Sequence, residues 1–354
     1  MSETVFLTGF PGFIAGRLLR RLARDNARFL LLVQPPFMAR AQAELAVLAA
    51  ETRRSVSDFN LLPGDITDPN LGMSESDVGR ARAETTILFH LAAIYDLAVA
   101  RDLAMLVNVA GTRHVNEFAR SLAALRQYHY VSTCYVAGRR TGRIFERELR
   151  HNAGFRNYYE ETKYLAEVEV EQVKGELPVT IHRPAVVCGD SRTGETAKYD
   201  GIYYLIRYLL KWPALLSSFN IGNREVALNL VPVDFVVEAM ATLAREPRAV
   251  GQTVQLADPA PLTTRELFNA IAASIKGRES RVTIPARLVE FSLMLPLAPR
   301  VSGLPHAAVP YFFLKQLYDT TCARELLTPH GITCPPFRSY VDTIVDFAAR
   351  HPTP

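Results

Sequence analysis

The sequence predicts an α/β protein with a doubly wound parallel sheet, and three observations support that prediction. Short, apolar runs alternate with segments of helical periodicity through the first half of the chain. A glycine-rich turn follows the first apolar run directly, at residues 8–16. The runs have no polar face, which indicates strands that helices cover on both sides, as in a parallel sheet.

Each predicted strand is a run rich in aliphatic and aromatic residues. These runs lie at residues 5–8, 29–33, 86–91, 128–131, 179–182 and 253–256. The helical patterns of the same region lie at residues 16–24, 102–124, 158–174 and 233–244. Strands and helices that alternate in this way form the doubly wound layout.

The pattern loosens over residues 189–224, which glycine, proline and aromatic residues interrupt. Thr263 and Glu266 have the spacing of a capping box, and the helix they begin is predicted to end at Gly277. A last amphipathic helix is predicted over residues 339–349. We expect these segments to form a smaller, mostly helical domain that packs over the carboxyl edge of the sheet.

The most apolar stretch, residues 288–304, is interrupted by Glu290, Pro296, Pro299 and Arg300. We interpret it as a buried helix followed by a loop. The functional alternatives are a wall for an apolar substrate and a surface that contacts lipid. The sequence has neither an uninterrupted apolar run of about 18 residues nor the pattern of a secretory signal. We therefore expect a cytoplasmic protein without a transmembrane segment.

Composition excludes several classes of protein. The 354 residues carry 40 basic and 36 acidic side chains, a net charge of +4, which disfavours a dedicated nucleic-acid or polybasic membrane binder. The hydrophobic fraction of 49% excludes a mostly disordered chain. The four cysteines form no C-x-x-C pair, and His90, His114 and His129 share no ligand spacing with them, so we expect no disulfide scaffold and no metal.

The glycine turn predicts a dinucleotide site. Gly9 and Gly12 permit a tight turn and a close approach of the backbone to a pyrophosphate, which the N-terminus of the next helix attracts. Ala15 takes the third position of the motif and is small enough for a helix to pack on a strand. A glycine turn is a weak signal alone, but its place directly after a buried strand is typical of the Rossmann fold.

The residues after the second strand bear on the choice of dinucleotide. NAD-binding chains carry an acid there, whereas this chain has Gln34, two prolines and then Arg40. The missing acid and the nearby arginine favour NADP(H) over NAD(H), and Arg17 is a second candidate for the 2′-phosphate. Each arginine is explained equally well as a solvated surface residue. Asp65, after a third apolar stretch, is either an adenine contact or a turn aspartate.

The catalytic prediction rests on Tyr159 and Lys163, whose spacing places them on one face of a helix. An ammonium near a phenol lowers the pKa of the phenol, which makes Tyr159 a usable acid near neutral pH. Such pairs are common by chance. Here, however, the preceding strand ends in Ser132 and Thr133, whose hydroxyls are expected at the carboxyl edge of the sheet where ligands bind.

In this order, the motifs resemble those of the extended short-chain dehydrogenase/reductase family. The resemblance is carried by residues 8–13, His90 to Ala93, Asn108 with Gly111 and Thr112, Val131 to Thr133, Tyr159 with Lys163, and His182 to Pro184. Residues 64–72, 189–194, 229–234 and 334–337 are most similar to the thioester-reductase and fatty acyl-CoA reductase branch. The match spans residues 4 to about 347, with one departure, because the branch usually has an arginine in place of Gln34.

The resemblance implies a Thr133, Tyr159 and Lys163 catalytic triad, with Tyr159 as the acid and Lys163 also bound to the nicotinamide ribose. The other cofactor residues it implies are Thr8, Gly9, Gly12, Phe13, Ile14, Asp65, Ile66, Ala92, Ala93, Asn108, Pro184, Val186 and Val187. Residues 1–188 plus about 225–258 are expected to form the NADP-binding Rossmann domain. Residues 189–224 plus 259–354 are expected to form the substrate domain.

We therefore predict an NADPH-dependent reductase of acyl thioesters, which gives an aldehyde; the sequence leaves open whether a second hydride then gives the alcohol. No carrier or adenylation domain fits in the chain, so the acyl group is expected to arrive on CoA or on a separate carrier protein. The candidates for carrier phosphates are Arg139, Arg140 and Arg192. An acyl channel is expected among Tyr199, Tyr203, Tyr204, Leu209, Leu210 and Trp212, which are equally explained as core.

Three other interpretations stay open. The same cofactor and triad serve a ketone or aldehyde reductase, or a sugar-nucleotide epimerase. A nucleotide-sensing regulator would use the fold as a binding module, although such a protein needs no proton donor. Cys134 adjoins Thr133 and is a candidate nucleophile, but a small buried thiol is the simpler interpretation. A serine-hydrolase route is disfavoured because the sequence has no Gly-x-Ser-x-Gly elbow.

Overall fold

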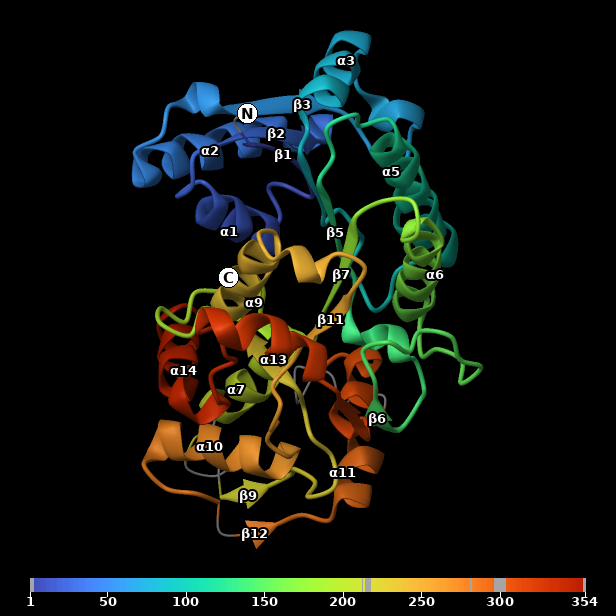
Figure 1. Ribbon diagram of the computed structural model, residues 1–354. Helices are drawn as coiled ribbons and strands as arrows, with labels where there is room; N and C mark the ends of the chain where they lie inside the picture. The colour runs from blue at the N-terminus through green and yellow to red at the C-terminus, as the bar shows by residue number, and fades with distance from the viewer. Residues whose placement is uncertain (1–2, 212, 214–217, 281, 296–303, 353–354) are drawn as a thin grey trace.

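The structure is a computed structural model that describes residues 3–211, 213, 218–280, 282–295 and 304–352. Its central sheet has seven parallel strands in the order β11-β7-β5-β4-β1-β2-β3 (Figure 1). The strands are β1 (Glu3–Thr8), β2 (Ala27–Val33), β3 (Phe59–Pro63), β4 (Ile87–His90), β5 (Gln127–Val131), β7 (Val179–Pro184) and β11 (Thr253–Leu256). The order runs outward from β1 in both directions, which confirms the predicted doubly wound fold.

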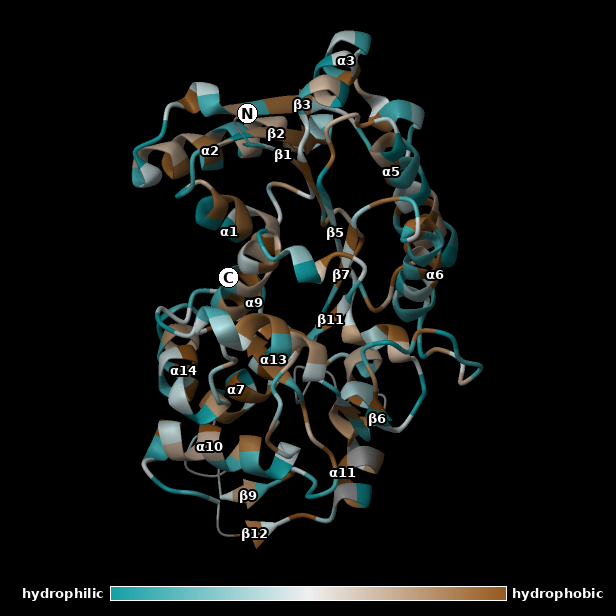
Figure 2. Cartoon of the chain, in the orientation of Figure 1, coloured by the Kyte–Doolittle hydropathy of each residue, from teal (hydrophilic) through white to brown (hydrophobic). Residues whose placement is uncertain are grey.

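Helices cover both faces of this sheet (Figure 1). One hydrophobic core joins the sheet to α1 (Phe13–Leu22), α2 (Met38–Thr52), α9 (Val233–Leu243) and α13 (Thr321–Leu327). The core on the other face joins it to α3 (Glu75–Glu84), α5 (Gly111–Arg120) and α6 (Tyr158–Val173). Burial from both sides explains why most strand residues are apolar (Figure 2). Strands β5 and β7 also bury the polar side chains of His129, His182 and Arg183.

The segment predicted as one helix over residues 102–124 is divided. It consists of α4 (Arg101–Ala104), a π-helical turn η4 (Met105–Ala110), and α5. Asn108 lies in the π turn and is buried, where its Oδ1 accepts a hydrogen bond from the Ile94 backbone N–H at 2.9 Å. Its Nδ2 donates to Thr162 Oγ1 at 3.0 Å, so the turn ties the loop after β4 to helix α6.

The second half of the chain builds a smaller core. Its helices are α7 (Ile202–Lys211), α10 (Thr264–Lys276), α11 (Ala286–Leu293) and α14 (Val341–Arg350). Three two-stranded parallel pairs accompany them: β8 (Val186–Cys188) with β10 (Leu230–Pro232), β9 (Phe219–Asn220) with β12 (Val282–Thr283), and β6 (Gly142–Ile144) with β13 (Gln316–Tyr318). These strands were not predicted because each is only two or three residues long.

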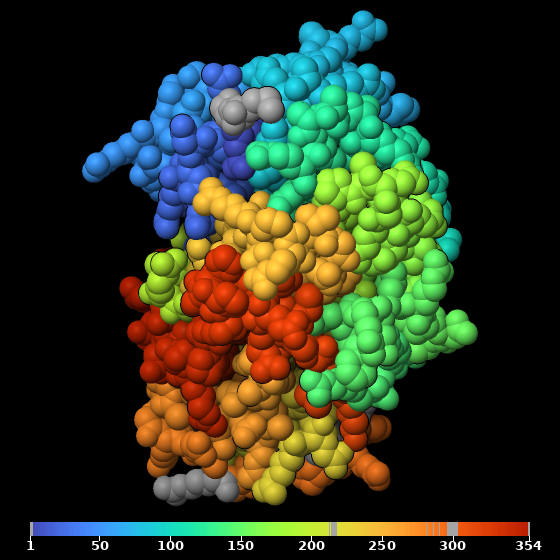
Figure 3. Space-filling model, in the orientation of Figure 1, coloured from blue at the N-terminus to red at the C-terminus, as the bar shows by residue number. Residues whose placement is uncertain are grey.

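Short 3₁₀ turns connect many of these elements. They are η1 (Pro35–Phe37), η2 (Val56–Asp58), η3 (Pro69–Gly72), η5 (Cys134–Ala137), η6 (Pro247–Ala249), η7 (His306–Phe313), η8 (Thr328–His330) and η9 (Phe337–Ser339). The chain returns to the first domain near its end, where α13 packs against β11 and β13 pairs with β6. Figure 3 shows this red segment lying against the green and yellow-orange segments that precede it.

The most apolar stretch of the sequence is only partly described. Residues up to Leu293 form α11, and the Leu288 and Phe291 side chains are exposed rather than buried as predicted. Helix α11 follows strand β12, and the Leu288 and Phe291 side chains do not belong to the hydrophobic core of α7, α10 and α14. Pro296, Pro299 and Arg300, the predicted loop, lie outside the described residues. Within the part of the chain that the structure describes, no helix is long and apolar enough to cross a membrane.

The predicted capping box is present at the start of α10. Thr263 Oγ1 accepts a hydrogen bond from the Glu266 N–H at 3.3 Å, and Glu266 Oε2 accepts from the Thr263 N–H at 2.8 Å. The helix ends at Gly277, whose φ of +70° places it in the left-handed region. Both ends of α10 therefore follow from local sequence.

Replacing Thr263 with alanine is expected to lower the free energy of unfolding by about 1 kcal/mol, because the orphan N–H group at the start of α10 loses its acceptor. Urea unfolding followed by circular dichroism measures the change. Thr263→Ser keeps the hydroxyl and serves as the control. Equal losses in both variants would contradict the capping role.

Candidate active site

The glycine turn after β1 packs directly against the end of β4. Gly9 has a φ of +95°, and a Cβ atom there would lie 2.9 Å from the backbone nitrogen of Ala92. A Cβ on Gly12 would lie 2.7 Å from the Gly9 carbonyl oxygen, to which the Gly12 N–H donates at 2.8 Å. Both positions therefore exclude any side chain, as a backbone cradle for phosphate requires.

Helix α1 begins immediately after this turn, with Gly12 at its N-cap. Its first turn has no acidic residue, and no side chain caps it. The first N–H groups of a helix lack intrahelical partners, and together with the helix dipole they attract anions. The turn and the helix terminus thus fit the pyrophosphate of a dinucleotide, with Phe13 and Ile14 at the first helical positions.

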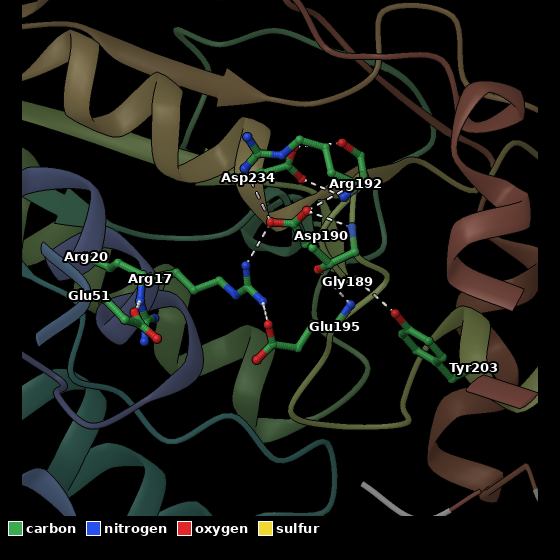
Figure 4. Close-up of polar contacts among 11 residues, drawn as sticks. Arg17, Arg20, Glu51, Gly189, Asp190, Arg192, Glu195, Tyr203 and Asp234 are labelled. Carbon is green, nitrogen blue, oxygen red and sulfur yellow. Dashed lines mark hydrogen bonds and ion pairs between the residues drawn. The ribbon is translucent and has the colours of Figure 1, made fainter. Parts of the chain in front are cut away.

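The two arginines predicted near the 2′-phosphate have different surroundings. Arg17 Nη1 lies 2.8 Å from Asp190 Oδ2, and its Nη2 lies 2.6 Å from Glu195 Oε2 (Figure 4). A phosphate contact by Arg17 would therefore require breaking these ion pairs. Arg40 Nη2 donates to the Pro11 carbonyl at 3.1 Å and Nε pairs with Glu44 at 2.7 Å, so Arg40 lies over the glycine turn itself.

Gln34 and Asp65 lie side by side at the ends of β2 and β3. Gln34 Nε2 donates to Asp65 Oδ2 at 2.6 Å, while Asp65 Oδ1 accepts from the Thr67 N–H at 2.9 Å. Asp65 therefore belongs to a structured turn and still lies at the carboxyl edge. Ile66 is buried, and a Cβ on Gly111 would lie 2.8 Å from its Cδ1, which explains the glycine at the start of α5.

The residues after β4 are held by the end of β1. Thr8 Oγ1 accepts hydrogen bonds from the N–H groups of Leu91 and Ala92, at 3.2 and 3.1 Å. The same hydroxyl lies 2.9 Å from His90 Nδ1. Burial lowers the pKa of His90 to about 3, with a further contribution from the Lys163 charge, so the imidazole is neutral. Ala92 and Ala93 are consequently fixed beside the glycine turn.

Thr133, Tyr159 and Lys163 come together at the end of β5. Thr133 follows the strand and caps η5, where its hydroxyl accepts from the Tyr135 N–H at 3.2 Å. Tyr159 lies in the first turn of α6, and Lys163 lies one turn further on. Lys163 Nζ donates to the Val131 carbonyl at 2.8 Å and to the Tyr130 hydroxyl at 3.0 Å, which fastens α6 to β5.

The pKa predicted for Tyr159 requires a correction. Burial raises the pKa of Tyr159 well above its usual value of 10, and the hydrogen bond with Thr133 lowers it only in part. The expected lowering by Lys163 is missing because Lys163 donates to Tyr130 and Val131. Burial also lowers the pKa of Lys163 to about 8, against the opposing charge of Glu167. Tyr159 is thus protonated at neutral pH and is suited to donate a proton.

Residues from both halves of the chain cover the Tyr159 ring. Tyr95, in the loop after β4, packs edge-on against it with ring centroids 5.2 Å apart. Lys198 lies over the Tyr95 ring at 5.5 Å, and a hydrogen bond joins Tyr95 to Asp200. Neither Tyr95 nor Asp200 was predicted from a sequence pattern. Tyr95 could have been suspected only because it follows strand β4, and Asp200 only because it precedes helix α7.

A cleft of about 470 Å³ lies beside the N-terminus of α6. Leu97 and Val99 line it and also belong to the hydrophobic cluster around Tyr159. The rest of the lining includes Arg156, Asn157 and Glu161, so the cleft is largely polar.

Tyr203 and Leu209, which were predicted to form an acyl channel, are instead buried in the core of the smaller domain. Trp212, from the same prediction, lies outside the described residues. Leu97 of the cleft also packs in one hydrophobic cluster with Tyr204, another residue of the predicted channel.

The remaining predicted residues lie at or near the same edge. Pro184 ends β7, and Val186 and Val187 lie in β8, where they pair with β10. Cys134 is buried, its thiol donates to the Arg183 carbonyl at 3.1 Å, and burial raises its pKa, which fits a core thiol rather than a nucleophile. Among the described residues, no three His, Cys, Asp or Glu side chains are placed to hold a metal ion.

The chain is similar to known proteins over most of its length. The sequence profile of an NAD-binding family described as male sterility protein matches residues 7–240. The chain is 27% identical over 286 residues to glycine betaine reductase ATRR of Emericella nidulans, covering 75% of this chain and 22% of that protein. It is 24% identical over 279 residues to the fatty acyl-CoA reductase wat of Drosophila melanogaster, covering 69% and 54%.

The chain therefore spans between about a fifth and about half of the length of these two curated relatives. Among solved structures, the terminal R domain from the myxalamid PKS-NRPS biosynthetic pathway has a TM-score of 0.83 at 25% identity. That match covers 99% of this chain and 91% of the R domain, so the similarity includes the smaller helical domain.

Gly9→Ala is expected to weaken NADPH binding at least about tenfold, because the new Cβ collides with the Ala92 backbone at a positive φ. Titration of nicotinamide fluorescence measures the affinity. Gly79→Ala is the matched control, since Gly79 lies in α3 with nothing within 4 Å of its Cβ position. Equal affinity in the two variants would contradict the cradle.

Proposed function

We propose, since the chain belongs to the male sterility protein family of extended short-chain dehydrogenases/reductases, that it is an NADPH-dependent reductase of acyl thioesters. The observation that carries the proposal is the meeting of Thr133, Tyr159 and Lys163 at the sheet edge that also holds the glycine cradle. The family consists of NAD(P)H-dependent oxidoreductases. The similarity to fatty acyl-CoA reductase wat and to the R domain supports an acyl thioester as the substrate class.

The chemistry divides between cofactor and chain. The bound nicotinamide supplies a hydride, which the carbonyl carbon of the thioester accepts. Thr133 and Tyr159 donate hydrogen bonds to the carbonyl oxygen, and donors aimed at developing negative charge contribute about 3–4 kcal/mol each. Tyr159 then gives its proton to that oxygen, and the resulting hemithioacetal loses its thiol to leave an aldehyde. Reduction of the aldehyde to the alcohol would need a second molecule of reduced cofactor for the hydride and a proton from Tyr159 after it has been reprotonated from solvent.

Two features support this division of roles. The raised pKa of Tyr159 keeps the phenol protonated until the oxyanion forms. Because Lys163 is fastened to Val131 and Tyr130, it holds α6, and therefore Tyr159, at a fixed distance from the end of β5. Pre-organised donors of this kind avoid reorganisation during the reaction.

We also propose the predicted division of the chain. Residues 1–188 and about 225–258 bind the cofactor, and residues 189–224 and 259–354 shape the substrate pocket. The separate core of α7, α10 and α14 supports this assignment. Helix α13 is the exception, because it packs in the core of the cofactor domain. Arg192, whose side chain is 72% exposed, is more accessible than Arg140, at 18%, among the arginines proposed to meet phosphates of CoA or a carrier.

Purified protein with NADPH is expected to reduce acyl-CoA thioesters, because Thr133 and Tyr159 are placed to stabilise an oxyanion. The loss of nicotinamide absorbance and the release of thiol are measured together. Aldehydes, ketones and UDP-sugars, each tested with NADPH and NADH, form the comparison panel. Turnover of ketones alone, without thiol release, would overturn the substrate assignment.

Tyr159→Phe is expected to lower kcat by about 100-fold or more, because the proton donor is lost while the ring keeps its packing. Steady-state rates and NADPH affinity are measured in parallel, and the affinity is expected to stay unchanged. Tyr164→Phe loses one hydroxyl from the same helix and should retain full activity. A fully active Tyr159→Phe enzyme would remove Tyr159 as the acid.

Arg40→Ala is expected to weaken NADPH binding about tenfold and to leave NADH binding unchanged, because only NADPH carries the 2′-phosphate. Arg113→Ala is the control, since Arg113 pairs with Glu169 on the opposite face of the sheet. Fluorescence titration with both cofactors gives the four affinities. An equal loss for NADPH and NADH would assign Arg40 to the glycine turn alone.

A further inference from the structure

A buried ion pair lies directly beneath the candidate triad. Ser132, Glu167 and Arg183 are only 4%, 0% and 1% exposed. The Ser132 hydroxyl donates to Glu167 Oε2, and Arg183 donates to Glu167 Oε1 from both Nε, at 2.9 Å, and Nη2. Arg183 Nη1 also donates to the carbonyls of Glu146 and Glu148, at 3.0 and 3.2 Å. Both Glu167 oxygens and all three guanidinium nitrogens are thus engaged.

Each member of this group adjoins a residue already placed in the site. Ser132 precedes Thr133 at the end of β5. Arg183 precedes Pro184 at the end of β7. Glu167 lies four residues after Lys163, on the same face of α6. The Glu167 carboxylate therefore joins three elements. These are the end of β5, which leads to Thr133; α6, which carries Tyr159 and Lys163; and β7, which ends at Pro184.

Stability alone is a poor explanation for this arrangement. Desolvation of two charges is costly, and well-packed apolar residues in place of a buried ion pair are often neutral or stabilising. A buried charge pair next to a reaction centre therefore calls for a second role, such as fixing geometry or tuning a neighbouring charge.

The charge on Lys163 is sensitive to this neighbour. Burial lowers the pKa of Lys163 to about 8, and the charge of Glu167 raises it. The titratable groups nearest the pair are His90 from β4, Tyr130 from β5, Cys134 from η5, Tyr159 from α6 and Arg183 from β7.

Two further acids act on this group: Glu171 on Arg183, and Glu146 on Cys134. The helices packed on α6 contribute Arg101 from α4 and Arg113 from α5, which pair with Glu161 and Glu169 of α6. Of the acids in this environment, Glu167 is the one whose charge raises the pKa of Lys163, and it lies one turn away on the same helix face.

We propose that Glu167 is a positioning residue of the reductase, whose carboxylate holds Ser132, and with it the Thr133 hydroxyl, and whose negative charge keeps Lys163 as an ammonium. The inference rests on the proposed function only in taking Thr133 and Lys163 as members of the catalytic triad. The two effects are separable. Fixing Ser132 needs hydrogen-bonding oxygens, whereas supporting Lys163 needs the charge.

The first test reads the Lys163 amine without any substrate. The sequence has only six lysines, so protein labelled with ¹³C at the lysine ε-carbon gives a small set of NMR signals. Lys163→Arg assigns the signal of interest. The chemical shift of this signal is followed against pH. The titration midpoint of the Lys163 amine is expected near pH 8 in the unaltered protein and about one pH unit or more lower in Glu167→Gln. Glu171→Gln, one turn further along α6, is the matched control and should leave the midpoint unchanged.

The second test uses activity with whichever carbonyl compound the protein reduces. Ser132→Ala keeps the ion pair, so kcat is expected to fall about tenfold with no shift in the alkaline limb of its pH profile. Glu167→Gln is expected to lower kcat and to move that limb to lower pH as well. A purely structural role would change the melting temperature and leave the limb in place.

Arg183 without its partner is a buried charge, so Glu167→Gln alone risks misfolding. Glu167→Gln combined with Arg183→Gln removes both charges and keeps polar groups that bond to each other. Because the two charges are opposite, the double variant is compared with Arg183→Gln, from which it differs only at Glu167. A folded Glu167→Gln protein with the Lys163 midpoint and kcat unchanged, or a double variant whose midpoint equals that of Arg183→Gln, would overturn the inference. A shifted midpoint in a protein that reduces no thioester would keep the inference and reject the proposed substrate.

Discussion

Parallel pairing of the seven strands is the constraint on which the site depends, because it places every strand's carboxyl end at one edge of the sheet. Residues that follow different strands, and are far apart in sequence, meet there. They are Gly9 after β1, Gln34 after β2, Asp65 after β3, Ala92 after β4, Thr133 after β5 and Pro184 at the end of β7. The register continues the same geometry, since Thr8 pairs with His90 and His90 with Tyr130. The loops that follow successive strands therefore lie side by side along one edge without any strand having to bend.

Polar groups in the dry interior keep these loop starts rigid. A buried polar atom without a partner is costly, so each one that is satisfied specifies a single local arrangement. The Thr8 hydroxyl secures the residues after β4, Asn108 secures the next part of that loop, and Lys163 secures α6 to β5. The same low dielectric raises the pKa of Tyr159 and lowers that of Lys163, so rigidity and chemical tuning have one physical origin.

Local sequence predicted the strands of the central sheet and both ends of α10, but not helices α2, α3 and α13. Apolar runs marked the strands because burial on both faces favours apolar residues, and Thr263 with Gly277 marked the ends of α10. The glycine positions followed from backbone geometry. Side-chain partners were not predictable, because they depend on segments brought together only by the fold. Lys163 was expected beside Tyr159 but donates to Tyr130, and Arg17 pairs with residues more than 170 positions away. The short paired strands and the π turn at Asn108 also arise from tertiary contacts rather than from a pattern.

The ion pairs of Arg17 give the molecule a thermodynamic linkage between its two parts. Arg17 lies on the helix that follows the glycine turn, while Asp190 and Glu195 belong to the segment that leads into α7. Ser191, in the same segment, donates to Asp234 at the start of α9, and Arg192 lies nearby (Figure 4). Any anion that attracts Arg17 must compete with these carboxylates, so its affinity includes the free energy of releasing residues 190–195. By reciprocity, any interaction that stabilises residues 190–195 against Arg17 weakens the binding of the anion by the same factor. The ion pairs of Arg17 therefore join the helix after the glycine turn to the segment before α7, and an anion bound by Arg17 would weaken that connection.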